Sequence, residues 1–354
     1  MIDFQYKALP WNIIFGVDAL TRLPEEIAKL GLRRALVLST PNQADQGQRI
    51  VEMLDNLAVG LFDQAMMHVP AETLAAATSA AKQLGADCTV AIGGGSTTGL
   101  GKALAAREGL NNIVIPTSYA GSEMTNIWAI TEENRKVTER NDTVVPTLTI
   151  YDPMLTLTLP PKFAAASGLN AMAQAVVNVA TDKPNPIISS LAADAVRALS
   201  HALPKILAEP DNIDARAEAL YGACLAGGAL GSGTTSLHHR LCHTFGGTFN
   251  TPHAETHAIL LPHSIAYNAS ATPVGTQMVA SSMGVDDAAL GLYELARVLG
   301  APSSLKDIGI NREDIEKAIA VTMEKPFDNP EPVTSARLHT LLENAFLGKR
   351  PSPA

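Results

Sequence analysis

The sequence predicts two domains: an α/β domain over residues 1–155 that is built on a parallel sheet, and an all-helical domain over residues 156–354. Before residue 155, short apolar runs alternate with helical stretches, a pattern typical of parallel strands that helices cover on both faces. After that point the chain consists of predicted helices separated by Gly and Pro. A length of 354 residues also suits two domains.

Local signals predict the individual elements. A helix is expected over Ala71–Leu84, between two of the apolar runs. Pro160-Pro161 marks the change between the domains, and Pro186 opens a helix whose apolar residues recur at every fourth position. The four expected strands are Arg34–Thr40, Cys88–Ile92, Asn112–Thr117 and Thr147–Asp152.

Composition excludes several classes of protein. The net charge is −9 and there is no long basic run, which argues against a nucleic-acid partner. The three cysteines are scattered and form no CxxC pair, so we expect reduced thiols and no zinc site of that type. The chain shows no signal-peptide pattern and no apolar run of membrane-spanning length, so we expect a cytoplasmic protein.

A glycine-rich turn joins the strand Cys88–Ile92 to a helix-like run over Gly99–Ala106. Glycines allow a phosphate to approach the backbone closely, and the N-terminus of a helix offers unpaired N–H groups to an anion. The turn lacks the GKS or GKT of a P-loop, which disfavours ATP chemistry. The residues predicted to hold a cofactor phosphate are Gly93, Gly94, Gly95, Ser96 and Thr97.

Two further strand ends are expected at the same edge of the sheet, where ligands bind in such folds. After the strand Asn112–Thr117 comes a polar turn, and the first strand ends near Thr40 and Asn42. No acidic residue stands there to repel a 2′-phosphate, so NADH and NADPH both stay open. The residues predicted to contact the cofactor at these ends are Thr40, Asn42, Thr117, Ser118, Tyr119 and Ser122.

Histidines cluster in the second domain, where His238 precedes two pairs with helical spacing. His239 and His243 are four residues apart, as are His253 and His257, so each pair shares one face of a helix. Histidines at this spacing either bind a divalent metal or serve as proton donors near neutral pH. The residue pattern alone leaves both interpretations open.

These motifs together resemble the iron-containing alcohol dehydrogenase superfamily along nearly the whole chain. The resemblance rests on GGGSTTG from Gly93, on IPTSYAGSE from Ile115, and on the pattern of His239, His243, Gly246-Gly247 and Pro252-His253. Within the superfamily, the chain is most similar to the branch that reduces 2-maleylacetate. The stretches that carry this closer similarity are Ala120–Thr125, His253–His257 and Asn329–Val333.

The resemblance implies a Rossmann-like N-terminal domain, an all-helical C-terminal domain, and a homodimer with its active site in the cleft between the domains. It implies NADH- or NADPH-dependent reduction of 2-maleylacetate to 3-oxoadipate. That reaction belongs to bacterial degradation of aromatic compounds through resorcinol, hydroxyquinol or chlorocatechols. The implied partner is thus a small dicarboxylate.

The chain departs from the metal-dependent members of that superfamily. Those members carry an Asp and a His four residues apart, followed by two more histidines that match His239 and His253. The first two positions hold Asn170 and Gln174 here. Because neutral amides supply neither a negative charge nor an imidazole nitrogen, we expect no metal requirement.

A metal-free mechanism suits an enone, which accepts hydride at the alkene carbon β to its ketone and becomes an enolate. His243 is the first choice for the proton donor. His239 and His253 are expected to bind the carboxylates or to assist, with Asn170 adding a neutral hydrogen bond and Tyr119 contacting substrate or cofactor. Two placements of Lys102 stay open, one in reach of the site and one too far along its helix. The helical phase of Arg240 puts it off the His239–His243 face.

Three alternatives remain at this stage. A metal-dependent alcohol or polyol dehydrogenase would require a metal ion, which a metal assay would detect. A lyase similar to dehydroquinate synthase shares the two-domain plan and uses NAD only transiently, so it would consume no net NADH. A non-catalytic ligand-binding protein derived from an enzyme is the third, and the retained histidine cluster argues against it.

Overall fold

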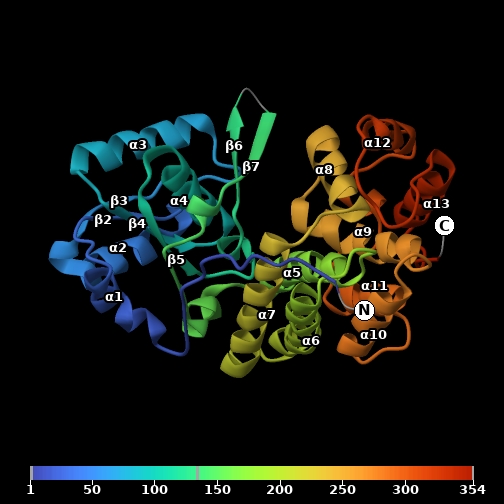
Figure 1. Ribbon diagram of the computed structural model, residues 1–354, viewed down its shortest axis with the longest axis horizontal. Coiled ribbons are helices and arrows are strands. Elements are labelled where there is room, and N and C mark those ends of the chain that lie inside the picture. The colour runs from blue at the N-terminus through green and yellow to red at the C-terminus, as the bar shows by residue number, and fades with distance from the viewer. Residues whose placement is uncertain (1–2, 133–134, 353–354) are drawn as a thin grey trace. The chain divides into compact units, whose positions relative to one another are not determined.

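The computed structural model describes residues 3–132 and 135–352, and contacts between residues divide the chain into two compact units (Figure 1). One unit is Ala8–Leu159, and the other joins Met1–Lys7 to Pro160–Ala354. The first unit ends four residues after the boundary expected at residue 155. It does so because Asp152 caps the 3-10 helix Pro153–Thr158 (η6) and also accepts a hydrogen bond from the backbone N–H of Leu20 in the same unit.

A six-stranded sheet forms the centre of the first unit, with the order β1-β8-β5-β4-β2-β3 and parallel pairing throughout. Figure 1 labels four of its strands, β2, β3, β4 and β5. The four strands expected from the sequence are confirmed as β2, β4, β5 and β8. The outermost strands β1 and β3 were not expected, because β1 has only three residues and β3 is mostly half-buried. The bounds are β1 Ile13–Phe15, β2 Ala35–Leu38, β3 Ala58–Phe62, β4 Cys88–Gly93, β5 Asn111–Pro116 and β8 Leu148–Tyr151.

Helices cover both faces of this sheet, because successive residues of a strand point to opposite sides. In β2, Val37 packs in the apolar cluster that contains residues of α1 and α2, whereas Leu38 packs in the cluster that contains residues of α3 and α4. The predicted helix Ala71–Leu84 is confirmed as α3. The remaining elements are α1 Leu23–Lys29, α2 Ala44–Leu54, α4 Gly95–Glu108 and an antiparallel hairpin of β6 Ile127–Glu132 and β7 Arg135–Arg140.

The second unit is helical, as the sequence predicts, and its helix α6 begins at Pro186. The side chain of Asn185 caps that helix by accepting hydrogen bonds from the backbone N–H groups of Ile187 and Ile188. No helix in the described ranges is long and apolar enough to cross a bilayer. The helices are α5 Pro161–Val179, α6 Pro186–Ala208, α7 Ile213–Ser232, α8 Leu237–Phe249, α9 His253–Asn268, α10 Pro273–Met283, α11 Ala288–Val298, α12 Asp314–Met323 and α13 Ser335–Phe346.

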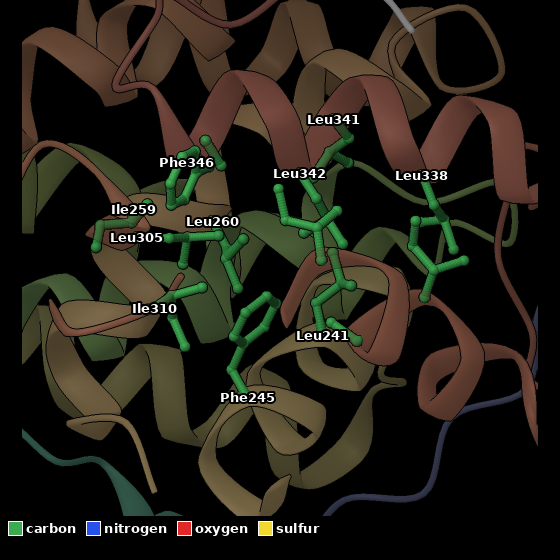
Figure 2. Packing of buried hydrophobic residues seen from close by; sticks show 14 of the residues in the cluster. Leu241, Phe245, Ile259, Leu260, Leu305, Ile310, Leu338, Leu341, Leu342 and Phe346 are labelled. Carbon is green, nitrogen blue, oxygen red and sulfur yellow. The ribbon is translucent and has the colours of Figure 1, made fainter. Parts of the chain in front are cut away.

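An apolar cluster fixes the position of α8, the helix that carries three of the histidines. Leu241 and Phe245 of α8 point into this cluster and meet Leu342 of α13 and Leu260 of α9 (Figure 2). All four side chains are fully buried. Because Leu241 and Phe245 are one turn apart, they define the core face of α8, and His239 and His243 fall on other faces of the same helix.

Candidate active site

The glycine-rich turn lies where β4 ends and α4 begins, and its first two glycines are closely packed. Gly93 has a φ of +143°, and a Cβ added there would lie 2.7 Å from Gln43 Oε1 and 2.7 Å from Thr97 Oγ1. A Cβ on Gly94 would lie 2.9 Å from Ser118 Oγ. The hydroxyl of Thr97 donates to the carbonyl of Gly94 at 2.9 Å. The positive φ and the close contacts of Gly93 therefore favour glycine there, whereas a side chain at Gly94 would displace the Ser118 hydroxyl.

Gln43, which the sequence did not single out, connects the carboxyl ends of three neighbouring strands. Its Nε2 donates to Thr117 Oγ1 at 3.0 Å, and Thr40 Oγ1 donates to its Oε1 at 3.2 Å. The backbone N–H of Thr117 also bonds the carbonyl of Gly93 at 2.9 Å. The predicted cofactor residues Thr40, Gly93 and Thr117 therefore meet at one edge of the sheet. Asn42 is exposed in the 3-10 helix Pro41–Gln43.

The side chain of Lys102 extends through the protein interior to the polar turn that follows β5. Lys102 is therefore not too far along its helix to reach this turn. Its ammonium donates to the carbonyls of Ser122 at 2.8 Å and Thr125 at 2.7 Å, and to Thr125 Oγ1 at 3.0 Å. Burial lowers the pKa of Lys102 to about 7, although the nearby Glu123 carboxylate opposes this shift. Lys102 thus holds the turn in place. Tyr119 of the same turn is fully buried.

Glu123 is the second buried ionisable group beneath this turn. Burial raises the pKa of its carboxyl group, while a hydrogen bond of 2.8 Å from the Tyr151 hydroxyl acts in the opposite direction. Glu123 was not among the site residues chosen from the sequence, and the placement of Lys102 was left open there. Their roles depend on burial and on partners far along the chain, which motif spacing does not report.

Three histidines of the second unit, His238, His239 and His253, lie around the ring of His257 on α9. His238 Nε2 lies 2.9 Å from His257 Nδ1, which is the distance of a hydrogen bond between two imidazoles. The ring centroid of His253 lies 4.4 Å from that of His257, and the centroid of His239 lies 5.7 Å from it. His243 and His253 are exposed, whereas His238, His239 and His257 are buried.

Burial sets the charge of these imidazoles. It lowers the pKa of His239 to about 3 and the pKa values of His238 and His257 well below the ordinary 6.5, with nearby histidines adding to each shift. These three rings are therefore neutral at physiological pH. Buried His239 Nδ1 has no hydrogen-bond partner within residues 3–132 and 135–352.

The residues present do not fit the iron site of the wider family. The resemblance places that site at two positions of α5 and at two histidines, namely Asn170, Gln174, His239 and His253. Asn170 and Gln174 lie one turn apart on α5, where each offers a neutral amide instead of a carboxylate or an imidazole. In the part of the chain that the structure describes, no group of three His, Cys or carboxylate donors close enough to share an ion includes His239 or His253.

Asn329 ties together the two helices that carry the histidines. Its Oδ1 accepts hydrogen bonds from the backbone N–H of Leu237 at the start of α8 and from Asn268 Nδ2 at the end of α9. Its own Nδ2 donates to Asn268 Oδ1 at 2.7 Å. Arg240 turns away from this site, as its helical phase predicts, because its guanidinium bonds the carbonyls of Val321 and Thr322.

Comparison with known proteins identifies relatives along the whole chain. Residues 10–153 match the family model for iron-containing alcohol dehydrogenase, and residues 164–346 match the C-terminal model of the Fe-containing alcohol dehydrogenase family. A maleylacetate reductase from Sphingobium indicum is 48% identical over 353 residues, which covers 100% of both chains. One from Burkholderia cepacia is 46% identical and covers 99% of this chain and 100% of its own.

Solved structures agree with these relatives. The crystal structure of maleylacetate reductase from Agrobacterium tumefaciens superimposes with a TM-score of 0.97 at 46% identity, covering 99% of this chain and 100% of the other. The maleylacetate reductase from Rhizobium sp. strain MTP-10005 gives a TM-score of 0.96, also at 46% identity and with the same coverage. The chain therefore belongs to the iron-containing alcohol dehydrogenase family and is an oxidoreductase of the branch that contains the maleylacetate reductases.

Proposed function

We propose that this chain reduces 2-maleylacetate to 3-oxoadipate with NADH or NADPH, in the bacterial degradation of aromatic compounds. The observation that carries the proposal is the full-length identity of 46–48% to maleylacetate reductases. The membership in an oxidoreductase family disfavours the lyase and the non-catalytic alternatives.

We also propose a cytoplasmic homodimer, which is supported by the exposed apolar residues Ile13 and Phe15 on the edge strand β1.

The first unit is the proposed site of the cofactor. Gly93–Thr97 would hold the pyrophosphate at the N-terminus of α4, where the backbone N–H groups have no partners within the helix. Thr40, Asn42, Thr117, Ser118, Tyr119 and Ser122 are the other proposed contacts. The end of β2 offers neutral side chains, among them Thr40 and Gln43. Neutral groups neither repel a 2′-phosphate nor attract one, which supports use of both NADH and NADPH.

The proposed chemistry reduces a carbon–carbon double bond and keeps the ketone. The nicotinamide supplies the hydride, which the substrate accepts at the alkene carbon β to the ketone. His243, exposed on α8, then donates a proton to the α carbon of the resulting enolate. Asn170 gives a neutral hydrogen bond, and His239 and His253 contact the carboxylates. One hydride and one proton balance the reduction.

We further propose that this reaction requires no metal ion. Reduction of a simple ketone to an alcohol benefits from a Lewis acid on the carbonyl oxygen, but an enolate is already stabilised by conjugation and by hydrogen-bond donors. The two amides of Asn170 and Gln174 support this proposal, because they replace the strongest ligands of a divalent site. A metal-dependent alcohol dehydrogenase would need both positions filled by better donors.

Isotope labelling tests the proposed function. Purified enzyme is given maleylacetate and NADH deuterated at the transferred position, and the product is identified by NMR and mass spectrometry. We expect one deuterium in 3-oxoadipate, on the methylene carbon that is bonded to a carboxylate and is β to the ketone. One NADH should be consumed for each substrate molecule. Deuterium on a carbinol carbon would indicate an alcohol dehydrogenase, and turnover without net NADH consumption would indicate a lyase. Either result overturns the proposal.

A further inference from the structure

Three potential metal ligands meet in the interior of the second unit, beside the rings of His239 and His253. His238 and Cys242 lie one turn apart on α8, and His257 faces them from α9. His238 Nε2 is 3.7 Å from Cys242 Sγ and 2.9 Å from His257 Nδ1. All three ligand atoms lie within 4.8 Å of one another, and the three side chains are only 1–2% exposed.

These separations are close to those of a metal centre. Metal–nitrogen and metal–sulfur bonds of about 2.0–2.3 Å set neighbouring ligand atoms about 3.5 Å apart. The distance between His238 Nε2 and Cys242 Sγ already matches this value. The two imidazole nitrogens of His238 and His257 are closer because they share a hydrogen bond, and they would separate by about 0.5 Å around an ion.

We propose that His238, Cys242 and His257 form a binding site for a soft monovalent metal ion, Cu(I), which uses none of the four residues at the iron position of the family. Thiolate and imidazole ligands suit soft ions, and a set of two histidines and one cysteine is known for copper. Charge selects between Cu(I) and Zn(II). Cu(I) with one thiolate is neutral overall, whereas Zn(II) would leave a positive charge buried, which is costly. Zn(II) also prefers four ligands.

The thiol of Cys242 supplies the negative charge that a bound ion needs. Burial raises the pKa of the Cys242 thiol, which therefore keeps its proton until an ion displaces it. Buried His257 Nε2 has no hydrogen-bond partner among the described residues, so it can carry the ring proton when Nδ1 binds. Binding thus releases one proton, from the thiol.

A bound ion would link α8 to α9 through three bonds and would stabilise the helical unit. Because a ligand that binds only the folded state raises its stability, Cu(I) should raise the temperature of unfolding. This consequence needs no substrate and no nicotinamide. Failure of the copper site would therefore leave the proposed reductase activity untouched, and loss of that activity would leave the copper site untouched.

The test is an anaerobic titration of the full chain with Cu(I), in competition with a colorimetric Cu(I) chelator. We expect one Cu(I) for each chain, release of one proton, and a higher unfolding temperature. Mutating residues that only support the metal ligands weakens metal binding in known sites by up to about a hundredfold. Cys242→Ser and His257→Gln each remove a direct ligand, so each should lower the affinity for Cu(I) by at least about a hundredfold. Cys224→Ser, at a buried cysteine of α7, and His253→Gln are the matched controls and should keep the affinity.

Three results would overturn the proposal: no uptake of Cu(I), undiminished affinity in Cys242→Ser, or loss of binding in His253→Gln, which would place the ion on the family's ligand positions. X-ray absorption of the Cu(I)-loaded native chain provides a measurement that needs no variant. One sulfur and two nitrogen neighbours around copper are expected. A copper ion without a sulfur neighbour would contradict the assignment even if Cys242→Ser fails to fold.

Discussion

Lys102 gives the chain a pH-dependent stability that a single substitution should remove. The side chain is buried, and burial lowers its pKa from 10.5 to about 7. Between these two pH values the unfolded chain binds a proton that the folded chain has lost, so the free energy of unfolding rises with pH in this window. Each pH unit contributes at most about 1.4 kcal/mol. The contribution from Lys102 therefore grows by about 3 kcal/mol between pH 6 and pH 9.

Lys102→Met removes this contribution together with the hydrogen bonds to Ser122 and Thr125. At pH 6 the variant loses the stabilising hydrogen bonds of Lys102 but also avoids the cost of burying its charged ammonium group. These two effects oppose each other, so the two proteins should have similar free energies of unfolding at this pH. At pH 9 only the lost hydrogen bonds remain, and the native chain should be the more stable one. The difference in unfolding free energy between the two proteins should rise by about 3 kcal/mol from pH 6 to pH 9.

Denaturant unfolding followed by tryptophan fluorescence measures this difference. Trp11 and Trp128 are the two tryptophans of the chain, and both belong to the unit that contains Lys102. Trp11 Nε1 donates to the carbonyl of Met124 at 2.9 Å, next to the turn that Lys102 holds. Lys82→Met, at an exposed lysine of α3, is the control and should show no such trend. A difference that stays flat or falls with pH would refute the reasoning.

Three other predictions concern the proposed site and the core. His243→Ala should lower kcat by about 10²–10⁴-fold while NADH binding stays unchanged. The control His201→Ala, at an exposed histidine of α6, should change neither kcat nor NADH binding. Unchanged turnover in His243→Ala would remove His243 from the mechanism. Gly94→Ala should weaken NADH binding in a fluorescence titration, because the new Cβ would lie 2.9 Å from Ser118 Oγ, and unaltered binding would contradict the role of this turn. Leu342→Ala should cost about 2–5 kcal/mol in denaturant unfolding, since the fully buried side chain fills the cluster of Figure 2, and a cost near zero would contradict that packing.

The central strands of the sheet could be predicted because burial on both faces gives continuous apolar runs, such as Cys88–Ile92. The edge strands β1 and β3 could not be predicted. Ile13 and Phe15 of β1 are exposed on either side of a buried Ile14, and three residues are too few to establish an alternation. In β3, half-burial and an internal Gly60 remove the apolar signal. The helix α6 was predicted at its first residue, Pro186.

The site was predictable where local spacing determines the geometry. The glycine-rich turn could be predicted because its residues are contiguous at one strand–helix junction. The histidine pairs could be predicted because residues four apart share one face of a helix. Gln43 was not predictable, because its partner Thr117 is 74 residues away in the chain. Spacing also did not separate His239 from His243, which share a helix but differ in burial. Burial decides which imidazole is neutral and which is open to the solvent, and only the fold supplies it.

The absorbance of reduced nicotinamide tests the central claim most directly. Purified chain is mixed with maleylacetate and NADH, and separately with NADPH, with and without a metal chelator. We expect rapid oxidation that survives the chelator, because Asn170 and Gln174 replace the strongest ligands of the family's metal site. Activity that disappears with the chelator and returns with iron or zinc would contradict the metal-free mechanism. Absence of oxidation with either nucleotide would contradict the proposed reaction itself.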